Sequence, residues 1–161
     1  MPVTHDIAAT YRHPRGVMRR LLALGPREDR ALVILIAGCV IMFVAQWPGL
    51  SRQAHETGEE LNMLLGASLM AWLFIAPLLF YLLAFLSQGL LWLLRRKVGG
   101  FATRIALFWA FLASSPLILL HGLVAGFVGP GLEERIVGAI WLVVFFWFWL
   151  SNLREAGWNT A

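Results

Sequence analysis

Long uninterrupted apolar runs dominate the chain, rather than the alternating pattern of a half-buried strand or the one-sided stripe of a surface helix. Four runs contain no Asp, Glu, Lys or Arg, and they cover residues 31–47, 61–94, 105–132 and 136–153. A helix that crosses a bilayer needs about 20 apolar residues, and its backbone must be hydrogen-bonded internally because lipid offers no partner. The pattern therefore predicts membrane-spanning α-helices.

We expect an all-α integral membrane protein, a bundle of four transmembrane helices preceded by a short cytoplasmic amphipathic helix. The second apolar run is too long for one straight crossing, since its helix would measure about 50 Å against a hydrocarbon core of about 30 Å. Pro77 is a candidate kink in it, and a break or re-entrant hairpin there would give five elements. The predicted domains are a basic segment 1–30, spans at about 31–48, 66–94, 104–127 and 136–153, and a tail 154–161.

The charges outside the runs predict the orientation. Six arginines and three acids precede the first run, and the loop 95–104 has four basic residues and no acid. The loops 48–62 and 129–135 have the opposite balance, with three Glu against one Arg and two Glu against one Arg. Because Lys and Arg near span ends favour the cytoplasmic side, this alternation predicts an even number of spans and two cytoplasmic termini.

Residues 15–24 form the predicted amphipathic helix, with apolar side chains on one face and arginines on the other. Arg15, Arg19 and Arg20 are candidate contacts to anionic lipid or to a protein partner, because each arginine near a membrane surface attracts acidic headgroups. A simple anchor that fixes the orientation of the chain explains the same pattern, and we favour it.

One predicted span carries most of the unusual residues, in the sequence ASSPLILLHGLVAGF at 113–127. A proline there predicts a bend, the serines can bond their own preceding turn, and glycines four apart let another helix approach closely. His121 is the only ionisable side chain deep in a predicted span, which makes it a functional candidate. A packing role is the simpler interpretation, while a proton, ligand or metal role stays open. The candidate functional or packing residues are His121, Ser114, Ser115, Pro116, Gly122, Gly126 and Pro77.

Composition and motifs argue against several kinds of chemistry. Of the 161 residues, 60% are hydrophobic and 14% charged, and the single cysteine, Cys39, can form neither a disulfide within the chain nor a cysteine metal centre. We find no His-Glu-x-x-His pair, no Gly-x-Ser-x-Gly elbow and no phosphate-cradling glycine loop. We therefore expect no catalytic, cofactor-binding or metal-binding residue and no enzyme activity. The net charge of +4 follows from the orientation of the spans, not from nucleic-acid binding.

Three stretches together resemble a known family. They are LLALGPREDRALVILIAGCVIMFVAQWPGL, APLLFYLLAFLS and RIALFWAFLASSPLILLHGLVAGFVGPG. The chain from about residue 21 to 150 is similar to the bacterial branch of the Yip family, multi-pass proteins named for interaction with Ypt and Rab GTPases. The resemblance implies a non-enzymatic protein of the bacterial inner membrane, concerned with membrane organisation or trafficking. It carries over no functional residue.

The sequence is compatible with three functions. The first is a Yip-like protein that acts through helix packing with membrane partners, through self-association or through effects on the lipid bilayer. The second is a small transporter or channel subunit with a polar path near His121, and the third is an accessory subunit of a larger membrane complex. The transporter would be favoured if Ser87 and Gln88 converged with His121, Ser114 and Ser115 on one cavity.

Overall fold

The computed structural model describes residues 3–96 and 98–158, and these residues form helices without a strand. Three helical stretches are long and apolar enough to cross a membrane, namely Glu28–Thr57, Leu61–Leu93 and Leu132–Gly157, and the bent pair α6–α7 adds a fourth if it is counted as one span. The prediction of an all-helical chain with apolar helices fit for a membrane is therefore confirmed. The helices are α1 (Val3–Arg12), α2 (Pro14–Ala23), α3 (Glu28–Thr57), α4 (Leu61–Met70), the π-helical turn η1 (Ala71–Ile75), α5 (Ala76–Leu93), α6 (Gly100–Ala113), α7 (Ser115–Phe127) and α8 (Leu132–Trp158).

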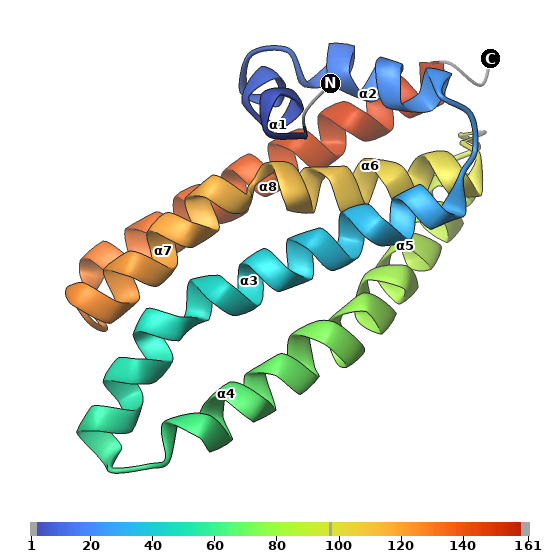
Figure 1. Ribbon diagram of the computed structural model, residues 1–161. Helices are drawn as coiled ribbons and strands as arrows, with labels where there is room; N and C mark the ends of the chain where they lie inside the picture. The colour runs from blue at the N-terminus through green and yellow to red at the C-terminus, as the bar shows by residue number, and fades with distance from the viewer. Residues whose placement is uncertain (1–2, 97, 159–161) are drawn as a thin grey trace.

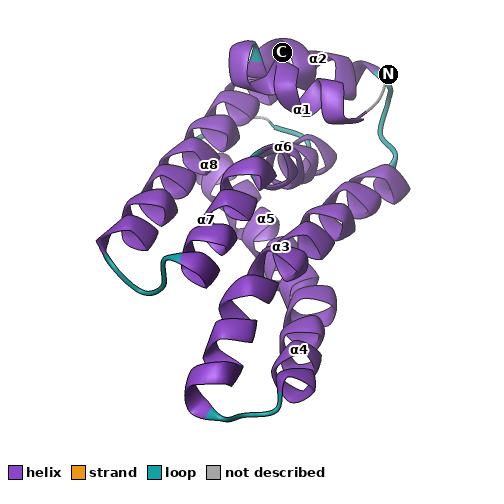
Figure 2. Cartoon of the chain, turned by 60° about the vertical axis from the view of Figure 1, so that its left-hand side comes forward, coloured by secondary structure: helices purple, strands orange, loops and turns teal. Residues whose placement is uncertain are grey.

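The long helices form an elongated bundle, with α1 and α2 lying across one end of it (Figure 1). The end of the bundle that carries α1 and α2, where α3 and α6 begin and α5 and α8 finish, is called the basic end. At the opposite hairpin end, α3 joins α4 and α7 joins α8. Figure 2 shows that these two helical hairpins diverge toward the hairpin end, while the helices are close together near α6.

Helix α6 forms the centre of the bundle. Every residue from Ile105 to Ala113 is buried, because α3, α5, α8 and α1 all pack around this helix. Its aromatic side chains meet those of α5, with ring centroids 5.1 Å apart for Tyr81 and Phe108 and 4.4 Å apart for Phe80 and Phe111. The core is thus dominated by large aromatic contacts at the basic half of the bundle.

Two prolines lie at irregular points of the apolar helices. Residues 61–93 form one continuous helix rather than a broken or re-entrant element, and the π turn η1 comes just before Pro77. In that turn the Ala76 N–H donates to the Ala71 carbonyl, which widens the helix where proline supplies no N–H. At Pro116 the helix instead breaks, and α6 and α7 meet at an angle of 43°.

Helix α3 continues beyond its predicted span 31–48, through Pro48 to Thr57. The extension is polar, and its Arg52 Nη1 donates to the Gly126 carbonyl at 3.4 Å while Nε donates to Glu56 at 2.7 Å. A guanidinium at the last carbonyls of α7 is favourable because the C-terminal end of a helix carries partial negative charge. Arg52 thus ties the end of α3 to the end of α7.

The N-terminal helices pack against the rest of the protein. The predicted amphipathic segment 15–24 overlaps α2, and Val17 and Met18 on its apolar face are buried beside α8. Tyr11 of α1 meets Phe148 edge-on, with ring centroids 5.0 Å apart. Helix α1 was not predicted, because it has only ten residues and too few apolar side chains to give a strong pattern.

Candidate ligand cavity at the hairpin end

The close approach of α3 and α7 determines the shape of the hairpin end. A Cβ on Gly122 would lie 1.8 Å from the carbonyl oxygen of Ala45, and a Cβ on Gly126 would lie 2.2 Å from the Cβ of Pro48. Any side chain at either position would collide with α3, so the two glycines let the helix backbones touch. His121 directly precedes Gly122 and is therefore held beside α3.

A cavity of about 400 Å³ lies next to this contact, between α3, η1, α7 and α8. Most of its wall is apolar, as is usual for small-molecule sites. The polar and aromatic side chains of the wall come from all four elements. They are Gln46, Trp72, His121, Glu134 and Trp141.

His121 is half-buried, and its Nδ1 atom is buried with no hydrogen-bond partner in the described part of the chain. Its ring lies against α8, where a Cβ on Gly138 would be 3.6 Å from the imidazole Cε1. A buried polar atom without a partner is costly unless water or a ligand completes it. Nδ1 is closed to water-sized molecules, so the imidazole lines the cavity through its other atoms while Nδ1 stays unsatisfied inside the packing.

Glu134 brings a carboxylate to the same cavity from the first turn of α8. It is half-buried, and within residues 3–96 and 98–158 it forms no ion pair, whereas its neighbour Glu133 is exposed and does not line the cavity. Gln46 is held in place by Ser68, whose hydroxyl donates to its Oε1 at 2.8 Å. The cavity thus combines one uncompensated negative charge with neutral polar groups.

Ser114 supports the aromatic wall of the cavity rather than lining it. Its hydroxyl donates to the Phe111 carbonyl at 2.8 Å and accepts the indole N–H of Trp141 at 3.1 Å. Ser115 is buried at the start of α7, directly before Pro116. The bend between α6 and α7 is therefore linked through Ser114 to a tryptophan of the cavity.

The remaining polar residues of the spans do not converge on His121. Ser87 donates to the Leu83 carbonyl of its own helix at 2.6 Å. Gln88 lines a different cavity at the basic end, together with Arg95 and Arg96. The two cavities share no lining residue, so Gln88 and His121 belong to separate sites.

The predicted arginine contacts lie at the other end of the molecule. Arg19 Nε donates to Glu155 at 2.8 Å, and this bond together with the attraction of the carboxylate raises the pKa of Arg19 above its ordinary value. Arg20 pairs with Asp6 at 2.9 Å, while Arg15 is exposed. Two of the three arginines thus bind acids of the protein itself.

Glu134, Gln46, Trp72 and Trp141 were missed by the sequence analysis. Glu134 was counted only as a loop charge, although its position three residues into the last helix could have suggested that it faces a neighbouring span.

No three His, Cys, Asp or Glu side chains of the described ranges could share a metal ion.

Comparisons with protein-family models, with curated proteins and with solved structures each gave no match. The function must therefore be argued from the geometry of the chain alone.

Proposed function

We propose that this chain is a non-catalytic four-span protein of the bacterial inner membrane that binds a small organic ammonium ion in the cavity around His121 and Glu134. Both termini lie in the cytoplasm, and the cavity lies in the outer half of the membrane. The observation that carries the proposal is a carboxylate without an ionic partner among the described residues, in a cavity that is also lined by the imidazole of His121 and by two indole rings.

An ammonium ion fits this set of groups better than an anion or a neutral molecule. Glu134 supplies the opposite charge, and a carboxylate paired with an N–H-bearing cation forms the stronger kind of hydrogen bond. Trp72 and Trp141 offer indole rings, the aromatic side chains that attract cations most strongly. The loops of the hairpin end contain five Glu against two Arg, which concentrates cations near the cavity.

Ser87 and Gln88 do not line this cavity, which counts against a transporter. The irregular helices are the feature that keeps a small transporter or channel subunit as a candidate. Trp72 belongs to the π turn η1, and Trp141 is hydrogen-bonded to Ser114 at the α6–α7 break. Interrupted helices beside a ligand site recur in transporters, because the freed backbone groups and the bend serve binding and movement. Passage to the cytoplasm would require a change at one of these two points.

Binding of benzylammonium to the purified full-length protein, followed by isothermal titration calorimetry in detergent, tests the proposal. Glu134→Gln should weaken binding at least tenfold through loss of the charge, and His121→Leu should weaken it severalfold. Glu133→Gln removes the same charge one residue away, outside the cavity, and should bind like the wild type. Equal affinities for Glu134→Gln and Glu133→Gln would contradict the proposal.

A second candidate function is the Yip-like one, association with another membrane protein. It is favoured by the span Leu61–Leu93, because 11% of an apolar 18-residue window of this helix is buried within the chain, against 39% of the corresponding window of α3. Purification in mild detergent with mass spectrometry tests it. A stoichiometric partner that is lost on Leu82→Arg but kept on Val143→Arg would support it, and a monomer or a self-oligomer alone would count against it.

A further inference from the structure

A third cavity, of about 620 Å³, lies at the basic end between α1, α2 and α3, and it shares no lining residue with the cavity around His121 or with the one beside Gln88. Its wall is largely apolar and includes Val17, Leu21, Ile34 and the indole of Trp109. Three charged residues also line it, and they are Asp6, Arg20 and Arg30. An apolar chamber with two cations and one acid on its wall has the composition of a site for an anionic amphiphile.

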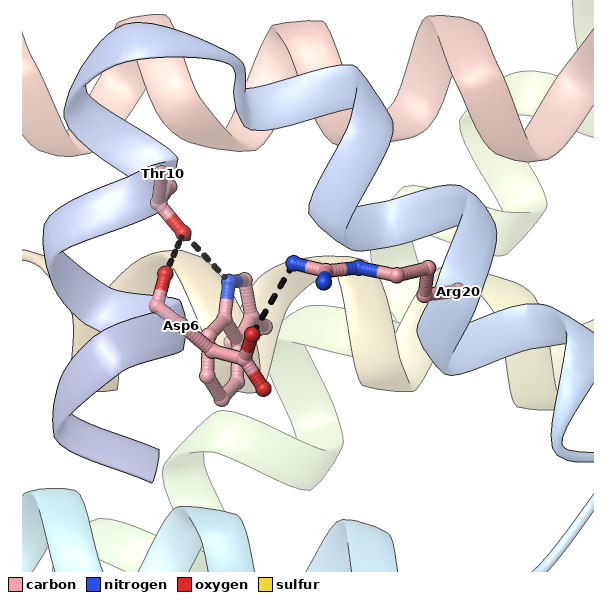
Figure 3. Close-up of polar contacts among 4 residues, drawn as sticks. Asp6, Thr10 and Arg20 are labelled. Carbon is pink, nitrogen blue, oxygen red and sulfur yellow. Dashed lines mark hydrogen bonds and ion pairs between the residues drawn. The ribbon is translucent and has the colours of Figure 1, made fainter. Parts of the chain in front are cut away.

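A chain of hydrogen bonds holds the helices together along one side of this cavity (Figure 3). The Thr10 hydroxyl donates to the Asp6 carbonyl at 2.7 Å and accepts the Trp109 indole N–H at 3.1 Å. Arg20 Nη2 donates to the Asp6 carboxylate at 2.9 Å. These bonds join α1 to α2 and α6, and they use the one acid of the cavity to pair with Arg20.

Arg30 is left without such a partner. Its Nη1 atom is buried, and within residues 3–96 and 98–158 nothing accepts a hydrogen bond from it. Its neighbours at the basic end are compensated, since Arg27 pairs with Asp29 and Arg104 with Glu28. Nη1 is closed to water-sized molecules, so a ligand would meet the rest of the Arg30 guanidinium, and an anion in the cavity would offset a positive charge that has no acid partner among the described residues.

The cavity wall reaches the outer surface of the protein at three apolar residues, of which Val3 is 53% exposed. Leu24 and Val33 line the cavity, yet they are 60% and 67% exposed. Val40 and Val44 extend this exposed apolar surface along α3. A molecule whose charged group met Arg30 would thus have its apolar part against the side of a membrane-compatible helix, as an acyl chain of a lipid does.

We propose that this cavity binds the headgroup of an anionic phospholipid, with the phosphate on Arg30 and its acyl chains along Val33 and the outer face of α3. Arg20 flanks the headgroup while it remains paired with Asp6. The site holds one lipid between the N-terminal helices and the first span, and so fixes α1 and α2 against the bundle. It does not depend on the ligand proposed for His121.

Thermal unfolding of the full-length protein in detergent, with dioleoylphosphatidylglycerol or zwitterionic dioleoylphosphatidylcholine added, tests the proposal. We expect phosphatidylglycerol to raise the unfolding temperature of the wild type more than phosphatidylcholine does. Arg30→Gln should need about tenfold more phosphatidylglycerol for half of this effect, as expected for loss of one charge-assisted hydrogen bond. Arg15→Gln removes an equal charge from an exposed position outside the cavity and should behave like the wild type.

Val33→Trp is a second variant, which leaves every charge in place and fills the mouth of the cavity. It tests lipid binding even if Arg30→Gln does not fold. It should also weaken the phosphatidylglycerol effect. An unchanged response of Arg30→Gln or Val33→Trp, or an equal loss in Arg15→Gln, would overturn the proposal. So would an equal rise in unfolding temperature with soluble glycerol phosphate, because the site would then bind a free anion and not a lipid.

Discussion

Replacing Gly122 by alanine is expected to destabilise the protein strongly, although only one methyl group is added. The new Cβ would lie 1.8 Å from the carbonyl oxygen of Ala45 and 2.7 Å from its carbonyl carbon. Both atoms belong to the backbone of α3, so no side-chain rotation can relieve the collision. Helices α3 and α7 must instead move apart until the contact reaches the 3.4 Å or more of ordinary van der Waals packing.

The cost follows from overpacking in a closely packed interior, which is typically about 1–3 kcal/mol. The upper end applies here, about 3 kcal/mol, because the obstacle is backbone and the moved helices would also lose contacts at Gly126 and Pro48. The shift would also deform the cavity that Gly122 lines. Binding of benzylammonium should therefore weaken along with stability.

The assay is reversible unfolding in mixed micelles with increasing sodium dodecyl sulfate, followed by far-ultraviolet circular dichroism. Gly66→Ala is the matched control, because Gly66 also lies in an apolar helix but a Cβ there meets nothing within 4 Å. It should be at least as stable as the wild type, because alanine favours a helix over glycine by about 0.5–1 kcal/mol. If Gly122→Ala proved as stable as Gly66→Ala, the described contact between α3 and α7 would be wrong.

Three further predictions concern the N-terminal helices. Thr10→Val leaves the buried Trp109 indole N–H without its acceptor and should lower the free energy of unfolding by about 1–3 kcal/mol. Thr10→Ser keeps the hydroxyl acceptor and should keep the free energy of unfolding near that of the wild type. Met18→Ala, at a fully buried position, should cost about 2–5 kcal/mol and speed tryptic cleavage of the N-terminal segment, while Leu24→Ala at an exposed position should not. Burial raises the pKa of Tyr11 above its ordinary 10.0, so the stability it contributes is present below pH 10.0 and falls as the pH rises further. Tyr11→Phe should therefore lose less stability than the wild type between neutral pH and pH 11, and equal losses would contradict the burial of that hydroxyl.

The apolar runs predicted the helices well because lipid imposes one rule on every residue of a span, internal backbone hydrogen bonding with apolar side chains outside. Local sequence also indicated irregularity at Pro77 and Pro116. It could not tell that Pro77 is accommodated by a π turn whereas Pro116 ends a helix, since this depends on neighbours. For Pro116 the neighbour is Trp141 of α8, which donates a hydrogen bond to Ser114 at the break.

The cavity could be predicted only in part. His121 stood out as an ionisable group among apolar residues, but its surroundings depend on which helices pack together, and one sequence does not specify that order. Glu134 lies in the acidic stretch before the last apolar run, and this position in the sequence predicts a solvent-exposed carboxylate. Only the fold brings α3, η1, α7 and α8 together so that the imidazole and the carboxylate line a common cavity. Likewise, Arg30 differs from Arg27 and Arg104 in having no acid partner among the described residues, and this difference depends on side-chain packing that the sequence does not specify.

The central claim is that an organic ammonium ion occupies the cavity at the hairpin end, and photo-crosslinking tests it most directly. An aryl azide derivative of benzylammonium would be activated on the full-length protein in detergent, and the labelled peptides would be mapped by mass spectrometry. We expect labelling at Met42, Trp72 and Trp141, which line the cavity, and its suppression by excess benzylammonium and by Glu134→Gln. Labelling that is spread over the exposed surface of α5, and that neither excess benzylammonium nor Glu134→Gln reduces, would contradict it.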